Sequence, residues 1–431
     1  MEIFKMNGLY GVAGFPVLHS KSPELFSLFS GEKGRYGRFL AATEEELRMI
    51  LTHFPLKGLN ITSPLKETAL KLADKSDEAA RNVGAANLLI REEGLWKACN
   101  TDYAAVRAFI RKSGIPKGCR VLIAGAGGAG KAAVLAALHE GMDVFLANRS
   151  TSRGEKTADL FKIPLIRWES SWESFRLLIC ALPRQADPLA LHPEFNGIII
   201  DAAYPGSETA LRGLKRGLKT FRGEEWLIEQ GRASFVLMTH SGPLTGDPGK
   251  EGLRSLKKGK PLILTGFMGT GKTALARELQ KEGMTHFSTD DEIEKRTALD
   301  RHEAFSTLGE KGFRALESDI VKRGELFSYD VIDSGGGLWL DPVNRERIPP
   351  EALVLFLWTT PETALKRASD RPLLSGKDKE EIFRLYEARL SSYFSLSDLI
   401  LATESLSVPE AAGRVKEEMK LSLQEGDEIG R

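Results

Sequence analysis

The chain has 431 residues, which is long enough to bury several hydrophobic cores and indicates about three domains. Its 60 lysines and arginines nearly balance its 59 aspartates and glutamates, so charge does not point to a nucleic acid or an acidic membrane surface as a partner. Three cysteines without a CxxC spacing are too few for a disulfide framework. Because the sequence also lacks a long apolar run and the apolar core of a signal peptide, we expect a cytoplasmic protein.

Short apolar runs alternate with helical patterns over the first hundred residues. We expect strands at 9–14 and 59–61 and a helix at 43–51, with Thr43 as its N-terminal cap. Such alternation predicts an α/β fold, in which functional groups gather at the carboxyl ends of the strands.

Polar side chains follow these strands and the turns after them. Taken singly, each is typical of a turn or of a solvated surface. Several of them at neighbouring strand ends favour one polar pocket. The residues concerned are Ser20, Ser22, Thr62, Lys66, Asn87 and Asp102.

A glycine-rich loop follows the next apolar run. Cys119 to Ala124 is a predicted strand, and Gly125-x-Gly127-x-x-Gly130 leads from it into an alanine-rich helix and a further strand at 143–147. This order is typical of a dinucleotide-binding lobe, in which the loop contacts the pyrophosphate. The loop residues expected to contact the cofactor are Gly125, Ala126, Gly127, Gly128 and Ala129.

The residues after the strand at 143–147 indicate which dinucleotide binds. NAD sites place an acidic residue there for the ribose 2′-hydroxyl, whereas this chain has Asn148, Arg149 and Arg153 and no acid among them. Two guanidinium groups suit a 2′-phosphate, so we expect NADP(H) as the cofactor. The alternative is a solvated basic loop.

Further strands are expected at 177–182 and 197–201, and a helix at 224–238. A Gly/Pro-rich break at 241–249 and a basic segment at 250–260 then mark a domain boundary.

This boundary divides the chain into residues 1–245, a linker at 246–258 and residues 259–431. Within the first part, we expect residues 1–102 and about 223–245 to form one lobe and residues 103–222 to form the nucleotide-binding lobe.

The C-terminal part opens on a second nucleotide-binding motif. A predicted strand from Pro261 leads into Gly266-x4-Gly271-Lys272-Thr273 and a helix, which argues against an ordinary glycine-rich turn. Glycine lets backbone N–H groups approach phosphate oxygens, the lysine charge reaches the β- and γ-phosphates, and the threonine hydroxyl can hold Mg²⁺. The residues expected to contact ATP are Gly269, Thr270, Gly271, Lys272, Thr273 and Ala274.

Charged side chains accompany the elements predicted after this motif. Asp290 follows a strand at 284–288, Arg314 and Glu317 lie on a helix at 305–323, and Arg389 lies on a helix at 381–393. A charged loop at 371–379 is suited to be a lid, because phosphoryl transfer requires the exclusion of water. The tail beyond residue 408 reads as a charged amphipathic helix with a packing role.

Together these motifs resemble two enzyme families. Residues 1 to about 245 resemble shikimate dehydrogenases through Ser20-Lys-Ser22 and Asn60-x-Thr-x-Pro-x-Lys66, and residues from about 259 to 420 resemble shikimate kinases. The resemblance implies a bifunctional enzyme of chorismate and aromatic amino acid biosynthesis, which reduces 3-dehydroshikimate with NADPH and phosphorylates shikimate with ATP and Mg²⁺. It also implies the fold: an α/β substrate lobe and a Rossmann lobe, followed by a P-loop domain of the nucleoside-monophosphate-kinase type with a lid.

For the dehydrogenase, the resemblance implies that Lys66 and Asp102 are catalytic and that Gly223 lies against the nicotinamide. Hydride delivery to a carbonyl leaves an alkoxide that needs a proton, and a lysine paired with a carboxylate can supply one. The implied substrate-binding residues are Ser20, Ser22, Thr62, Asn87, Asp102, Tyr204 and Gln230.

For the kinase, the resemblance implies that Lys272, Asp290 and Arg371 are catalytic, with Arg371 reaching the transferring phosphate of ATP from the lid. Arg367 is expected to stack on the adenine, and Glu317 to orient Arg314 from one helical turn away. Two arginines for one substrate carboxylate suit a transfer that depends on positioning and charge stabilisation. The implied substrate-binding residues are Asp290, Arg314, Gly336, Gly337 and Arg389.

The chain departs from both family patterns at a few positions. Cys180-Ala-Leu-Pro183 stands where the dehydrogenases usually carry Asn-x-Thr or Asn-x-Ser, Ala98 where they usually carry Gly, and Ser288 where the kinases carry the first acid of Asp-x-Asp. The departures at Cys180 and Ser288 leave one alternative open, a chain in which one half is a non-catalytic regulatory module. A separate alternative is a quinate/shikimate dehydrogenase that uses NAD, fused to a kinase, although no acid stands beside Arg149.

Overall fold

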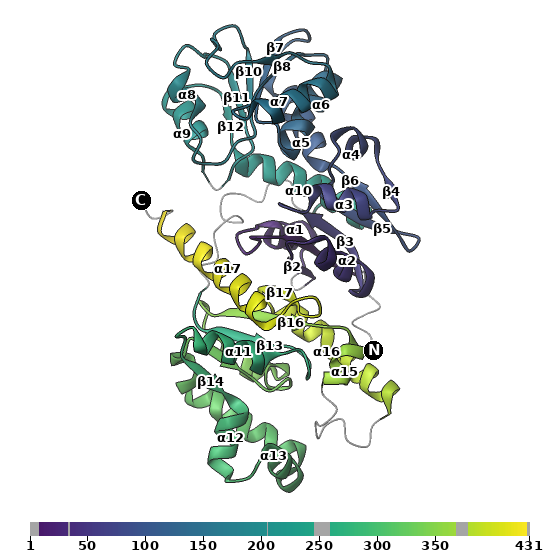
Figure 1. Cartoon of the computed structure of the whole chain (residues 1–431), viewed down its shortest axis with the longest axis vertical. Coiled ribbons are helices and arrows are strands. Elements are labelled where there is room, and N and C mark those ends of the chain that lie inside the picture. The colour runs from purple at the N-terminus through teal and green to yellow at the C-terminus, as the bar shows by residue number, and fades with distance from the viewer. Residues whose placement is uncertain (1–7, 33–34, 205, 245–258, 368–377, 429–431) are drawn as a thin grey trace.

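The computed structural model describes residues 8–32, 35–204, 206–244, 259–367 and 378–428, the last of these without the side chains beyond residue 420. The predicted linker at 246–258 and the predicted lid arginine, Arg371, lie outside these ranges. Within them the strands form one sheet of eleven strands and one of six (Figure 1). No helix in these ranges is both long and apolar enough to cross a membrane.

The N-terminal lobe is a mostly parallel sheet with helices on its faces, as the alternating pattern predicts. Strands β1 and β2 pair in parallel, β1 and β3 likewise, and β5 runs antiparallel to both β3 and β6. Thr43 caps α2 in a full capping box, which confirms the predicted start of that helix. The elements are β1 (Leu9–Gly14), α1 (Ser22–Ser30), β2 (Tyr36–Leu40), α2 (Glu44–His53), β3 (Leu56–Ile61), α3 (Lys66–Leu72), β4 (Lys75–Ser76), α4 (Glu78–Val83), β5 (Leu88–Glu92) and β6 (Leu95–Cys99).

The nucleotide-binding lobe is the six-stranded sheet, in the order β12-β11-β10-β7-β8-β9, with parallel pairing throughout. Its central strands are continuous apolar runs because helices cover both faces of a parallel sheet. Helix α10 returns from it to pack against α1 of the first lobe. The elements are α5 (Thr101–Ser113), β7 (Arg120–Ala124), α6 (Gly128–His139), β8 (Asp143–Ala147), α7 (Thr151–Phe161), β9 (Leu165–Ile166), β10 (Leu177–Cys180), α8 (Pro188–Leu191), β11 (Ile198–Asp201), α9 (Glu208–Lys215), β12 (Thr220–Phe221) and α10 (Gly223–Thr239).

The C-terminal part contributes five parallel strands in the order β14-β15-β13-β16-β17. The P-loop strand β13 lies at the centre, between β15 and β16, so the loop after it opens at the middle of the sheet edge. The elements are β13 (Leu262–Thr265), α11 (Lys272–Lys281), β14 (His286–Ser288), α12 (Thr289–Thr297), α13 (Arg301–Arg323), η3 (Glu325–Ser328), β15 (Val331–Asp333), η4 (Leu338–Leu340), α14 (Pro342–Arg345), β16 (Leu353–Trp358), α15 (Pro361–Arg367), α16 (Lys379–Leu396), β17 (Leu399–Ala402) and α17 (Val408–Glu428).

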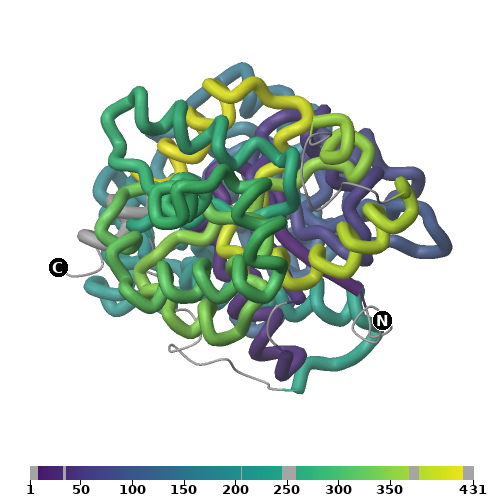
Figure 2. The backbone as a smooth tube through the Cα atoms, turned by 90° about the horizontal axis from the view of Figure 1, so that it is seen from below, coloured from purple at the N-terminus to yellow at the C-terminus, as the bar shows by residue number. Residues whose placement is uncertain are grey.

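The sheet of the C-terminal part continues into that of the N-terminal lobe. Strand β17 pairs in parallel with β2, with Ile400 opposite Phe39 and Leu401 opposite Leu40. The yellow C-terminal segments therefore lie beside the purple N-terminal ones, as both views show (Figures 1 and 2). Neither strand of this junction was predicted from the sequence.

Candidate active sites

A polar cavity of about 200 Å³ lies between the substrate lobe and the nucleotide-binding lobe. The structure brings together in it every residue predicted for the dehydrogenase substrate, although they come from the ends of β1, β3, β5, β6 and β11 and from α10. Gly223 and Ala129, which were predicted to contact the cofactor, also line it. The predicted residues in the lining are Ser20, Ser22, Thr62, Lys66, Asn87, Asp102, Ala129, Tyr204, Gly223 and Gln230.

Lys66 and Asp102 form an ion pair inside this cavity, with 2.7 Å between Lys66 Nζ and Asp102 Oδ2. Asp102 is buried, and its other oxygen accepts a hydrogen bond of 3.1 Å from Nε1 of Trp226 on α10. The carboxylate is therefore fixed from two sides and holds the ammonium in one direction. Trp226 was missed at the sequence level, because a tryptophan on a predicted helix reads as a core residue.

Asn87, just before β5, lines the cavity and is bonded to both α5 and α10. Its Oδ1 accepts a hydrogen bond of 2.7 Å from the backbone N–H of Thr101, and its Nδ2 donates one of 3.0 Å to Oε1 of Gln230. Asn87 is 2% exposed, so these partners satisfy a buried amide and fix which way it faces. Gln230 is thereby oriented as well, through its Oε1.

The dinucleotide loop lies directly against the lysine of this pair. A Cβ built on Gly128 would lie 3.6 Å from Cδ of Lys66. The loop itself depends on glycine: Gly125 has a φ of 113°, and a Cβ there would collide with the carbonyl oxygen of Ala181. A cofactor held by this loop would reach the cavity beside Lys66.

The residues after β8 lie beside the glycine loop. Asn148 Oδ1 accepts a hydrogen bond of 3.1 Å from the N–H of Ala126, which ties the strand end to the glycine loop. Arg149 and Arg153 are exposed, at the strand end and in the first turn of α7. Cys180, one of the departures, is buried beneath α9 with its Sγ 3.6 Å from Oγ1 of Thr209, and burial raises the pKa of its thiol.

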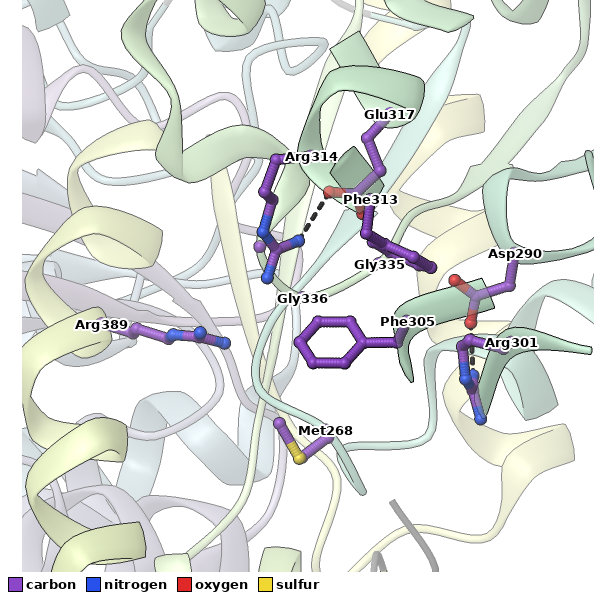
Figure 3. A pocket seen from close by; sticks show the side chains of 11 residues that line it. Met268, Asp290, Arg301, Phe305, Phe313, Arg314, Glu317, Gly335, Gly336 and Arg389 are labelled. Carbon is purple, nitrogen blue, oxygen red and sulfur yellow. Dashed lines mark hydrogen bonds and ion pairs between the residues drawn. The ribbon is translucent and has the colours of Figure 1, made fainter. Parts of the chain in front are cut away.

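A second pocket lies in the C-terminal part, next to the P-loop, and has a volume of about 80 Å³ (Figure 3). All the predicted residues for the kinase substrate line it, and they come from α12, α13, the glycine turn after β15, and α16. The lining residues are Met268, Asp290, Arg301, Phe305, Phe313, Arg314, Glu317, Gly335, Gly336, Gly337 and Arg389.

Two arginines in this pocket are arranged for an anion. Arg314 donates from Nη1 to Oε2 of Glu317 at 2.6 Å, as the helical spacing predicts, and a Cβ on Gly337 would collide with its guanidinium. Arg389 is 8% exposed, and its Nη1 has no hydrogen-bond partner among the described residues. A buried guanidinium nitrogen without a partner is costly, so it fits a site that receives a carboxylate.

A third arginine in the pocket was not predicted. Nη1 of Arg301, in the first turn of α13, lies 2.5 Å from Oδ2 of Asp290 (Figure 3). Asp290 lies on α12, so this ion pair joins the two helices across the pocket mouth. Position 301 lies before the helix predicted at 305–323, so no periodic pattern drew attention to it.

The P-loop has the geometry of an anion cradle. Gly266, Gly269 and Gly271 all have positive φ, and Nζ of Lys272 donates to the carbonyls of Gly266 and Phe267 at 2.9 and 2.8 Å. Burial lowers the pKa of Lys272, while the nearby carboxylate of Asp333 acts in the opposite direction.

Asp333 was not predicted as a site residue, yet it lies at the centre of the P-loop site. It ends β15 beside β13, and it is the register partner of Ser288 on β14. Burial raises the pKa of its carboxyl, and Lys272 and a hydrogen bond with the Thr273 side chain oppose that shift. The carboxylate missing at Ser288 is therefore matched by one on the adjacent strand.

The remaining predicted nucleotide contacts lie around the P-loop. Thr270 is buried and donates from its hydroxyl to the carbonyl of Phe267 at 2.8 Å, whereas Ala274 is exposed. Arg367 is exposed at the end of α15, and Arg371 lies outside the described residues.

These two sites define the class of protein, an enzyme with two small-molecule active sites. One site has a dinucleotide loop beside a lysine–aspartate pair, and the other has a P-loop beside an arginine-lined pocket. Family models match both parts, one for the shikimate dehydrogenase substrate binding domain at residues 12–89 and one for shikimate kinase at residues 268–420.

Known relatives divide between the two parts in the same way. A shikimate dehydrogenase (NADP(+)) of Anaeromyxobacter sp. is 30% identical over a match that covers 54% of this chain and 90% of that relative. A shikimate kinase of Moorella thermoacetica is 35% identical over a match that covers 38% of this chain and 96% of that relative. A 37% identical match to the Syntrophobacter fumaroxidans dehydrogenase spans 56% of that relative. A solved structure of shikimate 5-dehydrogenase from Thermus thermophilus, in complex with NADP(H) and shikimate, is 30% identical with a TM-score of 0.50 and covers 57% of this chain and 96% of its own.

The chain belongs to the shikimate dehydrogenase family through its N-terminal part and to the shikimate kinase family through its C-terminal part. It is therefore a bifunctional enzyme of the shikimate pathway, as the sequence motifs predict.

Proposed function

We propose that the N-terminal part reduces 3-dehydroshikimate to shikimate with NADPH, and that the C-terminal part transfers the γ-phosphoryl group of ATP to the 3-hydroxyl of shikimate. The observation that carries the first reaction is the ion pair of Lys66 and Asp102, held in a polar cavity against the dinucleotide loop. A P-loop beside a pocket with three arginines supports the second.

In the reduction, bound NADPH supplies the hydride. The Lys66 ammonium donates a proton to the oxygen that becomes the new hydroxyl, so that no free alkoxide is formed. Asp102 keeps that ammonium oriented, because Trp226 holds its second oxygen. With 26% of its side chain exposed, Lys66 can regain its proton from water.

The cofactor preference rests on the residues after β8. Arg149 and Arg153 are exposed at that strand end and are not accompanied by an acid, so they suit the 2′-phosphate of NADP(H). The names of the dehydrogenase relatives agree with this preference. We expect Arg149→Ala combined with Arg153→Ala to lower the rate with NADPH several-fold and to leave the rate with NADH nearly unchanged.

In the phosphorylation, Arg314 and Arg389 hold the shikimate carboxylate and Asp290 accepts hydrogen bonds from its hydroxyls. Buried Glu317 keeps Arg314 directed into the pocket. Lys272 stabilises negative charge on the phosphates, as the P-loop lysine does in this class of site. Arg371 and Arg367 stay predicted contacts of the phosphate and the adenine.

The P-loop residues fit a magnesium ion that ATP brings with it. Thr273 and Asp333 offer hard oxygen ligands side by side, and Mg²⁺ in such sites takes one or two protein oxygens together with phosphates and water. The described residues hold no group of three or more His, Cys, Asp or Glu side chains placed for a metal. When bound, the ion neutralises charge between the β- and γ-phosphates.

A coupled assay tests both proposals in one chain. With 3-dehydroshikimate, NADPH, ATP and Mg²⁺, we expect shikimate 3-phosphate to form, and we expect no product when NADPH or ATP is omitted. Lys66→Ala should abolish NADPH oxidation and leave shikimate phosphorylation intact, and Lys272→Ala should do the reverse. Loss of both reactions in either folded variant would contradict two independent catalytic centres.

A further inference from the structure

The last helix of the kinase part reaches into the dehydrogenase part. Glu418 lies on α17, is 1% exposed, and accepts hydrogen bonds from two backbone N–H groups of the N-terminal lobe. Its Oε1 lies 2.5 Å from the nitrogen of Val17, and its Oε2 lies 3.1 Å from the nitrogen of Leu18. Both carboxylate oxygens are thus used by residues about four hundred positions earlier in the chain.

The two N–H groups belong to the turn that precedes the substrate-binding serines. Ser20 N–H donates to the carbonyl of Val17 at 3.0 Å, which closes the turn, and Ser20 and Ser22 then line the dehydrogenase cavity. On its other side the turn is held by Arg38 of β2, which donates to the Ser20 carbonyl at 2.8 Å. Val17, Leu18 and Arg38 are all buried, so these bonds are shielded from water.

The surroundings of Glu418 are tied to the N-terminal lobe by several contacts. One turn earlier on α17, Arg414 pairs with buried Glu46 of α2 at 2.8 Å, and its guanidinium lies over the ring of Phe15. Beside this helix, β17 and β2 share one sheet (Figure 1). These contacts place the Glu418 carboxylate beside the turn. Its two hydrogen bonds to the turn's backbone are charge-assisted, and such bonds are stronger than neutral ones, so they hold the turn well.

We infer that Glu418 is a positioning residue for the dehydrogenase, supplied by the kinase part of the chain. It holds the turn at Val17 and Leu18 in the conformation that presents Ser20 and Ser22 to shikimate. Without it, two buried N–H groups lack their acceptor and the turn populates other conformations. The apparent affinity for shikimate is then the intrinsic affinity multiplied by the fraction of chains whose turn is in place, whereas the rate of the bound complex is unchanged.

Glu418→Gln tests this inference, which rests on the proposed dehydrogenase function. The glutamine has the same shape but offers one acceptor oxygen in place of two. We expect the KM for shikimate, measured as its oxidation by NADP⁺, to rise about tenfold, equivalent to about 1.4 kcal/mol. The kcat and the KM for NADP⁺ should change by less than about twofold, and so should both kinase parameters, which also report that the chain is folded.

Glu417→Gln is the matched control, because Glu417 is the neighbouring exposed residue on the same helix. A second variant, Glu418→Asp, keeps the charge on a shorter side chain and should raise the same KM, so the result does not depend on one substitution folding well. An unchanged shikimate KM in both variants overturns the inference, and so does an equal loss of both activities, which indicates general destabilisation. Absence of shikimate oxidation in the unaltered chain overturns the proposed function instead.

Discussion

Replacing Phe54 by alanine should destabilise both enzymes at once. Phe54 follows α2 in the dehydrogenase part and is 1% exposed. Its ring centroid lies 5.0 Å from that of Phe39 in the same lobe, but also 5.3 Å from Trp358 and 5.7 Å from Phe394 in the kinase part. The side chain is therefore part of a core that belongs to neither half alone.

The size of the effect follows from burial. Truncating a buried phenylalanine to alanine costs about 3–5 kcal/mol through lost transfer free energy and the cavity left behind. At about 2.1 cal/mol/K of unfolding entropy per residue, the roughly 310 residues outside the nucleotide-binding lobe give about 0.65 kcal/mol/K, so the midpoint at which they unfold should fall by about 5–8 °C.

The assay heats the protein and then measures the two activities separately. We expect Phe54→Ala to lower the midpoints of dehydrogenase and kinase inactivation together. Phe195→Ala is the control: Phe195 is fully buried, but its core consists of nucleotide-lobe residues, so kinase inactivation should keep its midpoint. The reasoning is refuted if Phe54→Ala lowers only the dehydrogenase midpoint.

Three further predictions concern the kinase pocket. The charged residues lining it sum to one positive charge, so Arg301→Met should raise the KM for shikimate, an anion, roughly tenfold, with a smaller effect at high salt. Asp333→Asn should raise the Mg²⁺ concentration that gives half-maximal rate by about tenfold or more. Adding Ser288→Asp on the adjacent strand should lower that concentration part of the way back. Since burial lowers the pKa of Lys272, that residue loses its charge as pH rises toward 10.5, and kcat/KM for ATP should begin to fall below that pH.

Each of these has a contrary outcome. A fall in the shikimate KM of Arg301→Met would mean that the arginine competes with the substrate for Asp290. Arg296→Met is the control variant for Arg301→Met, because it breaks ion pairs outside the pocket. Binding of Mn²⁺ in the presence of ATP, followed by electron paramagnetic resonance, should weaken in Asp333→Asn; unchanged binding would remove Asp333 from the metal site. Lys272→Arg should lack the alkaline fall, because arginine stays charged.

The motifs predicted the two folds and the two pockets well, because their residues lie at strand ends or on helices with clear patterns. The strand at Leu9–Gly14 and the strand at Asp143–Ala147 have the predicted bounds. The carboxyl ends of parallel strands lie along one edge, so Ser20, Lys66 and Asp102 could be assigned to one cavity from their positions after strands. Gln230, within α10, was assigned only through the family resemblance.

What the patterns did not predict depends on tertiary contacts. Strand β2 contains Gly37 and Arg38 and β17 has four apolar residues, so neither has a periodic signal that separates it from a loop or a helix end. Trp226 and Asp333 each act through a neighbour that only folding brings close. The tail helix, predicted for packing alone, carries Glu418 on its buried face.

The pairing of β2 with β17 also bears on solubility. A strand at the edge of a sheet exposes unpaired N–H and C=O groups, which is the usual starting point for edge-to-edge aggregation. In this chain the two strands cover one another, and the edges left on the long sheet are β14 and β4, of three and two residues. Either half expressed alone would uncover a strand of four or five mostly buried residues, so joining the two enzymes removes an aggregation hazard from each.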